Sequence, residues 1–502
     1  MNAHVNTLAN VVGRVWVAAL GAILIPVYVK LMGVESYALV GIAGTLYSIF
    51  GMLDLGLGAG LNREIARLTA AGASDQERRD LLATFDVLGG GVAVLASLAV
   101  YFMAPFIAYR WVNAQELDRG AIVDAIRMIG VWIGLQLPIG FYQGGVNGLE
   151  RQVLSNALWI SLHTVRGIGS VLVLTLIAPT VRVFFGWQLV VWVVGVIMWA
   201  TVLHLLVDRG QGRGTPRRDL FNRVWRYSAG WIGNSAGVVG LGMTDKVVLS
   251  RVLTLRDFGY YTFASYGAQL LLNLVTSVVE AAFPRVNRLL ARNDQEGLRA
   301  EYRRGNQTIV TLLMPVAFVI IFFNREALLI WTRDAELTAA TSTLLAILAT
   351  GMIGLGLGQI AYFTALAHGM FRMTMKLTAV LAVIFVPLMI LVPRWYGVIG
   401  AAVVWAAMSA CRAISVPLLH RHHLKGEGMI WLRQAVIVPV LVTGVIGAVA
   451  RVLAPHFTNT LMTLAYLAAT WLLMVIALIA VEPAMRATVM SAFRTLAART
   501  SA

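Results

Sequence analysis

Apolar segments of about twenty residues follow one another from the beginning of this 502-residue chain to its end. A helix of that length is long enough to cross the hydrocarbon core of a bilayer. Only 13% of the residues are charged, against roughly a quarter in a soluble domain. The segments are continuous rather than alternating, which disfavours a β-barrel. We therefore expect an all-α, polytopic membrane protein.

Hydropathy indicates about fourteen membrane-spanning helices. Their expected limits are 8–30, 36–58, 81–109, 120–147, 156–177, 183–207, 228–252, 259–284, 306–331, 338–366, 373–393, 398–419, 433–454 and 458–481. The first segment lacks the basic start of a cleaved signal peptide and is too long for one, so we expect it to be retained.

Lys and Arg gather in one set of the predicted loops. Of the 40 basic residues, 25 lie in alternate loops or in the C-terminal tail, 10 in the opposite loops and 5 inside apolar segments. Short loops that are rich in Lys and Arg stay on the cytoplasmic side of a membrane. We therefore expect both termini to be cytoplasmic. The same rule accounts for the formal charge of +16 without a nucleic-acid partner.

The longest of the basic loops, residues 208–227, is expected to be a linker between two halves of the chain. It contains four turn-forming residues, which are Gly210, Gly212, Gly214 and Pro216. A weak internal repeat supports this division, because two pairs of charged residues are each separated by 222 positions. The pairs are Glu35 with Asp257, at the start of the second span of each half, and Arg63 with Arg285, just past its end.

Six spans in each half predict two pseudo-symmetric lobes in the same orientation. The expected domains are an N-lobe at 1–207, the linker at 208–227 and a C-lobe at 228–419. Residues 420–502 would add two further spans and an amphipathic cytoplasmic tail.

Five basic residues lie inside the apolar segments, namely Arg14, Arg127, Arg166, Lys246 and Arg412. A cation at the centre of a membrane helix costs roughly 2.5–3.5 kcal/mol even on insertion scales, so it normally faces a bundle interior or a wet cavity. A cationic cavity suits an anionic solute, and arginine binds phosphate through a two-pronged fork. We expect substrate binding by Arg14, Arg166, Lys246 and Arg412. A nearby Asp124 can neutralise Arg127 in a local ion pair.

Intramembrane carboxylates leave two alternatives open. Each buried arginine can instead pair with a carboxylate of another helix and hold the bundle together; the available partners are Asp54, Asp86, Asp245 and Glu280. The same groups can carry coupling protons, since acids inside a membrane mark proton pathways. We expect ion coupling or a place in the cavity for Asp54, Asp245 and Glu280.

Motifs of soluble enzymes do not explain this chain. It contains neither the G-x-x-x-x-G-K-[ST] loop nor H-E-x-x-H. The G-N-S-A-G sequence at 233–237 lies in an apolar segment instead of a strand-to-helix turn. His420, His422 and His423 lie in a basic loop, where a solvated face is more usual than a metal site. We expect no catalytic residue, metal or cofactor.

Two stretches carry a family resemblance. The first runs from a Leu/Met-Gly turn at 31–33 through Tyr37 and the Leu-Asp-Leu-Gly-Leu sequence at 53–57 to Asn62-Arg63. It resembles the N-terminal signature of Wzx-type polysaccharide flippases, which belong to the MOP superfamily together with multidrug exporters and the peptidoglycan-precursor flippase. The sequences at 243–249 and 257–261 are similar to the corresponding opening of the second lobe.

The resemblance implies a V-shaped pair of six-helix lobes around a cavity lined by the first, second, seventh and eighth helices. Arg14, Asp54, Asp245, Lys246 and Glu280 would then line the cavity, whereas Arg166 lies on the fifth span. Family members are thought to move polyprenyl-pyrophosphate-linked oligosaccharides across the bacterial inner membrane by alternating access. The implied partners are this lipid-linked substrate, membrane lipids and other polysaccharide-assembly proteins.

Two other functions fit a polytopic protein. A cation-coupled multidrug exporter of the same fold would favour acidic over basic residues in its cavity, and the surplus of buried arginine disfavours it. A membrane polysaccharide polymerase would resemble enzymes with a large periplasmic loop, and the predicted outer loops here are all short.

Overall fold

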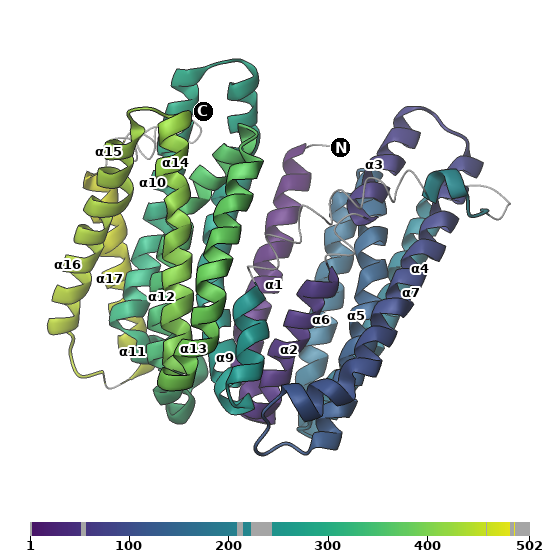
Figure 1. The fold of residues 1–502 in the computed structure, drawn as a ribbon, viewed down its shortest axis with the longest axis horizontal. Coiled ribbons are helices and arrows are strands. Elements are labelled where there is room, and N and C mark those ends of the chain that lie inside the picture. Colours follow the sequence, from purple (N-terminus) through teal and green to yellow (C-terminus); the bar gives the residue numbers. More distant parts are fainter. Residues whose placement is uncertain are drawn as a thin grey trace. The chain divides into compact units, whose positions relative to one another are not determined.

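The computed structural model describes residues 3–51, 57–207, 214–221, 243–457, 459–481 and 486, and Figure 1 shows them as bundles of long helices. Among these residues the sole extended pairing is an isolated bridge between Asn113 and Thr254. The predicted all-α class is therefore confirmed. By contacts, the chain forms two compact units, Met1–Gly259 and Tyr260–Ala502.

Twelve of the described helical segments are long and apolar enough to cross a membrane. One of them, Phe371–His422, is 52 residues long. A single helix of that length would extend about 80 Å, far beyond the roughly 30 Å of hydrocarbon. It bends at Gly397, which has a φ of 57° and a ψ of −146°, and so comprises the two spans expected there. Of the predicted span at 228–252, the structure describes 243–252, which is helical.

The N-terminal unit begins with two helices joined by a glycine turn. Gly33, with a φ of 81°, separates the first helix from the second, at the turn that the sequence motif predicted. The helices of this unit are α1 (Ala3–Met32), α2 (Val34–Gly51), α3 (Leu57–Ala70), α4 (Asp75–Phe106), the π-helix η1 (Ile107–Trp111), α5 (Arg119–Gly148), α6 (Gln152–Leu176), α7 (Val181–Val207), the helical residues 243–252 and the start of α9 (Leu255–Ala291).

Glycine allows α5 to lie at the centre of the N-terminal unit, where it packs against α3, α4 and α7. A Cβ on Gly144 would lie 2.2 Å from the carbonyl oxygen of Gly58, so the backbones of α5 and α3 touch. Small residues permit such close contact between membrane helices. A core of large side chains surrounds this contact and includes Phe85, Phe141 and Trp199, each 0–1% exposed.

The C-terminal unit is built around α12, which is buried on most sides and packs against α13 and α10. A Cβ on Gly354 of α12 would lie 2.6 Å from the Cα of Ala410 in α13, so glycine again permits close contact between two helices. Beyond the rest of α9, its helices are α10 (Gln295–Phe322), α11 (Asn324–Thr332), α12 (Ala335–Ala367), α13 (Phe371–Cys411), the 3₁₀ helix η2 (Arg412–Ile414), α14 (Ser415–His422), α15 (Glu427–Trp431), the π-helix η3 (Leu432–Ile437), α16 (Val438–Val452) and α17 (Thr460–Val481).

The last two spans, α16 and α17, pack against α10 of the C-terminal unit. Their shared core includes Val319, Phe323, Leu467 and Met474. The expected span at 306–331 is wrong at one end, because α10 ends at Phe322 and a separate helix begins at Asn324. Phe323 leaves the helical region there, with a φ of −124°. The amphipathic tail expected after the last span falls almost entirely outside the described residues.

Candidate substrate site

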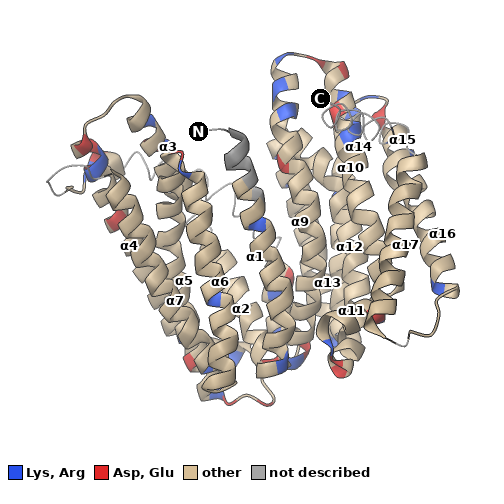
Figure 2. Ribbon diagram, turned by 180° about the vertical axis from the view of Figure 1, so that it is seen from behind, with Lys and Arg blue, Asp and Glu red and all other residues tan. Residues whose placement is uncertain are grey.

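Charged residues gather mainly at the two ends of the helices, as Figure 2 shows. Arg14 departs from this pattern, because it lies within the apolar first helix. Its side chain is exposed, and the neighbouring Val12 and Val15 are 51% and 62% exposed. One face of this stretch of α1 is therefore left uncovered, while Gly13 on another face is buried against Asn156.

A row of polar contacts, the α1–α6 seam, holds α1 against α6. Asn156 Nδ2 donates to Asn10 Oδ1 at 2.5 Å, and Trp16 Nε1 donates to Thr164 Oγ1 at 2.9 Å. Further along, Tyr28 Oη donates to the carbonyl oxygen of Gly167 at 3.0 Å. Hydrogen bonds with these directions fix how far one helix can slide or turn against the other. The seam thus fixes Arg14 in register with α6.

The same seam relates Arg14 to Arg166, the basic residue on α6. The two helices run in the same direction, and Gly167 lies against Leu20 and Leu24 of α1. Arg166 is therefore roughly 10 Å further along the bundle than Arg14, at a rise of about 1.5 Å per residue.

Arg166 is half-buried, and α7 fixes its backbone. Trp187 Nε1 of α7 donates to the Arg166 carbonyl oxygen at 3.2 Å. One turn earlier, the buried His163 packs its ring 4.2 Å from Trp159 and 5.9 Å from Trp192, centroid to centroid. Its Nδ1 lies 3.1 Å from the Trp159 carbonyl oxygen. This histidine is a packing residue of the α6–α7 contact.

The helical residues 243–252 place an acid and a base side by side in sequence but in different surroundings. Asp245 is 3% exposed, whereas Lys246 is half-buried. Successive helical residues point about 100° apart, so the two side chains do not face each other. Both residues belong to the N-terminal unit, as do Arg14 and Arg166.

The remaining candidates fall elsewhere. Arg412 is half-buried and begins a turn of 3₁₀ helix at the end of α13, where a continuous span was expected. Its carbonyl oxygen accepts from Ser415 Oγ at 2.9 Å. Glu280 is exposed on α9, and both residues belong to the C-terminal unit. Asp54 lies outside the described residues.

Two expected roles of carboxylates need correction. Asp124 pairs with Arg182, at 2.6 Å, instead of with Arg127. The Arg127 guanidinium lies over the Tyr101 ring, 4.8 Å from its centroid. Helix geometry permitted the local pair, but a longer-range partner on α7 competes for the carboxylate. Local neutralisation of Arg127 by Asp124 was therefore wrong.

The second carboxylate, Asp86, was an expected partner for a buried arginine. It instead accepts a hydrogen bond from Tyr142 Oη at 2.8 Å and lies 3.1 Å from His204 Nε2. The histidine cluster also differs from expectation, because His420 is 6% exposed and its Nε2 lies 3.0 Å from Tyr302 Oη. Within the described ranges, no group of three or more His, Cys, Asp or Glu side chains could hold a metal ion.

A loop that the sequence did not single out, residues 112–118, ties the start of α2 to the start of α9. The buried carboxylate of Glu35 accepts from the backbone N–H groups of Gln115 and Glu116 at 2.7 and 2.8 Å. The Leu255 N–H donates to the Asn113 carbonyl oxygen at 2.8 Å. The beginning of α9 is thus held by the N-terminal unit, and this explains why the compact units divide at Gly259.

Glu35 and its repeat partner Asp257 lie at equivalent helix starts but make different hydrogen bonds. Asp257 exchanges hydrogen bonds with Thr254, whose Oγ1 donates to Oδ2 at 2.9 Å and accepts from the Asp257 N–H at 3.1 Å. That reciprocal arrangement caps α9. The sequence repeat found the two positions, but the partners of Glu35 are 80 and 81 residues away and left no local signal.

The family model described as "Polysaccharide biosynthesis protein" matches residues 4–290, more than half of the chain. No curated protein sequence matches.

Solved transporters share the fold. The lipid II flippase MurJ, in an inward closed conformation, has a TM-score of 0.71 and 12% identity, over 94% of this chain and 98% of its own. A multidrug resistance MATE family transporter of the MOP superfamily, in an inward-facing conformation, has a TM-score of 0.66 and 14% identity, over 82% of this chain and 96% of its own. At these identities the likeness concerns the fold.

Proposed function

The chain belongs to the polysaccharide biosynthesis protein family, and from this premise we propose that it flips a polyprenyl-pyrophosphate-linked oligosaccharide across the bacterial inner membrane. The glycan would serve exopolysaccharide or O-antigen synthesis. The shared fold with a flippase and a transporter supports transport over an enzymatic reaction. Membrane lipids and other polysaccharide-assembly proteins are the further partners of this proposal.

The observation that carries the proposal is the exposed Arg14 on an apolar helix, held in register with Arg166. A cation in such a place is expensive unless an anion or water faces it. Pyrophosphate is an anion that arginine binds through two parallel hydrogen bonds. The polyprenyl tail can stay in the bilayer, so the protein has to shield only the headgroup. Lys246 and Arg412 complete the proposed cationic set.

We further propose that transport proceeds by alternating access of the lobes at 1–207 and 228–419. Asp54, Asp245 and Glu280 would serve ion coupling or line the cavity. The burial of Asp245 supports this role, because acids inside a membrane protein typically mark ion or proton pathways.

We also propose that both termini and the 208–227 linker lie in the cytoplasm. Reporter domains fused after Arg226 and at Ala502 should be active only if they require a cytoplasmic location. Activity of a periplasmic reporter at either point would contradict the orientation.

The substrate class is tested with purified protein in proteoliposomes. A short oligosaccharide on polyprenyl pyrophosphate is placed in one leaflet, and its appearance in the other is followed with a glycan-cleaving enzyme added outside. Faster exchange than in protein-free liposomes is expected. Exchange at the protein-free rate, together with proton-driven uptake of a cationic dye, would favour the multidrug exporter instead.

A further inference from the structure

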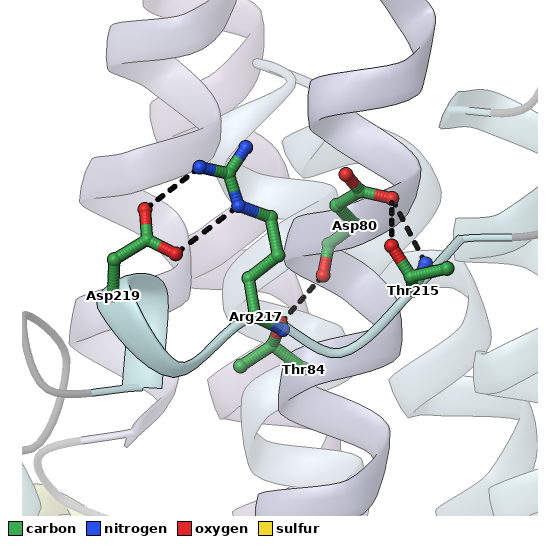
Figure 3. Close-up of polar contacts among 5 residues, drawn as sticks. All are labelled: Asp80, Thr84, Thr215, Arg217 and Asp219. Carbon is green, nitrogen blue, oxygen red and sulfur yellow. Dashed lines mark hydrogen bonds and ion pairs between the residues drawn. The ribbon is translucent and has the colours of Figure 1, made fainter.

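The described part of the linker, residues 214–221, is bound to the side of α4. The Asp80 carboxylate accepts from the Thr215 N–H at 2.9 Å and from Thr215 Oγ1 at 3.2 Å, and Thr84 Oγ1 accepts from the Arg217 N–H at 2.9 Å (Figure 3). Thr84 Oγ1 in turn donates to the Asp80 carbonyl oxygen at 2.6 Å. Three of these bonds join the linker to α4 and hold it as a wall along the helix, and the fourth lies within α4.

A groove lies between this wall and α4. The groove is open to its surroundings, and the space of about 700 Å³ in it includes open solvent. The floor follows one face of α4 at Val87, Gly91 and Leu95, a four-residue spacing that covers about 12 Å of helix. Val87 and Leu95 are 64% and 69% exposed, and a Cβ on Gly91 would meet nothing within 4 Å. The floor is therefore apolar, shallow and uncovered.

The charge of the groove is confined to its linker end. Arg217 and Arg218 are the charged residues that line it. Arg217 donates to both carboxylate oxygens of Asp219, at 3.0 and 3.1 Å, and this hydrogen bonding lowers the pKa of the Asp219 carboxyl. Asp219 is therefore ionised at neutral pH and neutralises Arg217. The exposed Arg218 supplies the net positive charge of the groove.

From this arrangement we infer that the groove is a binding site for an anionic phospholipid, with an acyl chain along Val87, Gly91 and Leu95 and the phosphate at Arg218. A cation at one end of an apolar channel matches the two parts of such a lipid. A free phosphate ion has no apolar part that could pack on the floor of the groove. A zwitterionic lipid such as phosphatidylcholine carries a cation beside its phosphate, and this cation weakens the attraction to Arg218.

The site is separate from the proposed substrate site, since it lies on α4 and the linker and includes none of the basic residues assigned there. Because the lipid would contact both α4 and the linker, it would also strengthen the attachment of the linker to the N-terminal unit. An occupied groove would therefore slow hydrogen exchange at the Thr215 and Arg217 amides.

Native mass spectrometry of the delipidated full-length protein tests the inference. Phosphatidylglycerol and phosphatidylcholine with the same acyl chains are titrated against wild type, Arg218→Gln and Gly91→Trp, with Arg292→Gln as the control for an exposed arginine elsewhere. Wild type and the control should prefer phosphatidylglycerol about fivefold, the contribution of one basic residue. Arg218→Gln should lose this preference, and Gly91→Trp should bind both lipids more weakly.

An unchanged preference in Arg218→Gln, or unchanged binding in Gly91→Trp, would overturn the inference. Displacement of phosphatidylglycerol by inorganic phosphate or by polyprenyl pyrophosphate would also overturn it, because the site would then serve those ligands. Both substitutions lie at exposed positions, so a variant that elutes as wild type in size exclusion gives a direct answer.

Discussion

Arginine is used in contrasting ways in the two compact units. In the C-terminal unit, Arg303 of α10 donates two hydrogen bonds of 2.7 Å to Glu427 of α15, whose side chain is 2% exposed. In the N-terminal unit, Arg14 is exposed on an apolar helix. The hydrogen bonds of the α1–α6 seam are made by other residues of that helix. Geometry therefore identifies Arg303 as part of the scaffold, whereas our proposal assigns the exposed Arg14 to substrate binding.

The difference teaches how to separate structural from functional charge in a membrane protein. A forked pair between two helices fixes their packing, and its loss leaves a buried group unsatisfied. An exposed arginine in an apolar stretch adds little to packing and is costly in hydrocarbon. Substitution should therefore affect stability in the first case and activity in the second.

Charge reversal at Arg14 is expected to have the largest effect. Arg14→Glu places an anion against the pyrophosphate, so polymer export should fall by about 30-fold or more, the effect of losing a close charged contact. Membrane abundance and thermal stability should stay near wild type. Export assays and immunoblots of the same cells measure both quantities. A fall in abundance that matches the fall in export would place Arg14 in the scaffold beside Arg303.

Removal of Glu427 is expected to have the opposite profile. Glu427→Ala leaves the Arg303 guanidinium without its forked partner, and Arg303 is 43% exposed, so water recovers part of the loss. The free energy of unfolding should fall by about 1–3 kcal/mol. Thermal unfolding in detergent checks this, with transport normalised to folded protein. Intact stability together with lost transport would show that the C-terminal pair is functional.

The helices were predictable because hydropathy is a local property. The break at Phe323 was missed, although the polar residues Asn324, Arg325 and Glu326 directly after it interrupt the apolar run. Charge partners were harder still. Glu427 lies 124 residues from Arg303, and Asp124 has both a local and a distant cation within reach. The sequence thus identified the unusual charges, but not which of them the fold would pair.

Loss of an exposed ion pair should have the smallest effect on stability and export. Asp124 and Arg182 lie 2.6 Å apart, yet their side chains are 41% and 56% exposed. Such pairs contribute roughly 0–1 kcal/mol. Asp124→Asn should therefore shift thermal stability by less than Glu427→Ala and should leave export unchanged. A loss as large as that of Glu427→Ala would show that exposure is a poor guide to structural charge here.

Binding of the lipid-linked substrate tests the central claim most directly. Purified wild type, Arg14→Lys and Arg14→Ala are titrated with an oligosaccharide on polyprenyl pyrophosphate, beside Arg303→Lys as the matched arginine of the scaffold. Affinity should fall from wild type to lysine to alanine, because lysine keeps the charge but loses the fork. Arg303→Lys should bind as wild type while unfolding more easily. Wild-type affinity in Arg14→Ala would contradict the account.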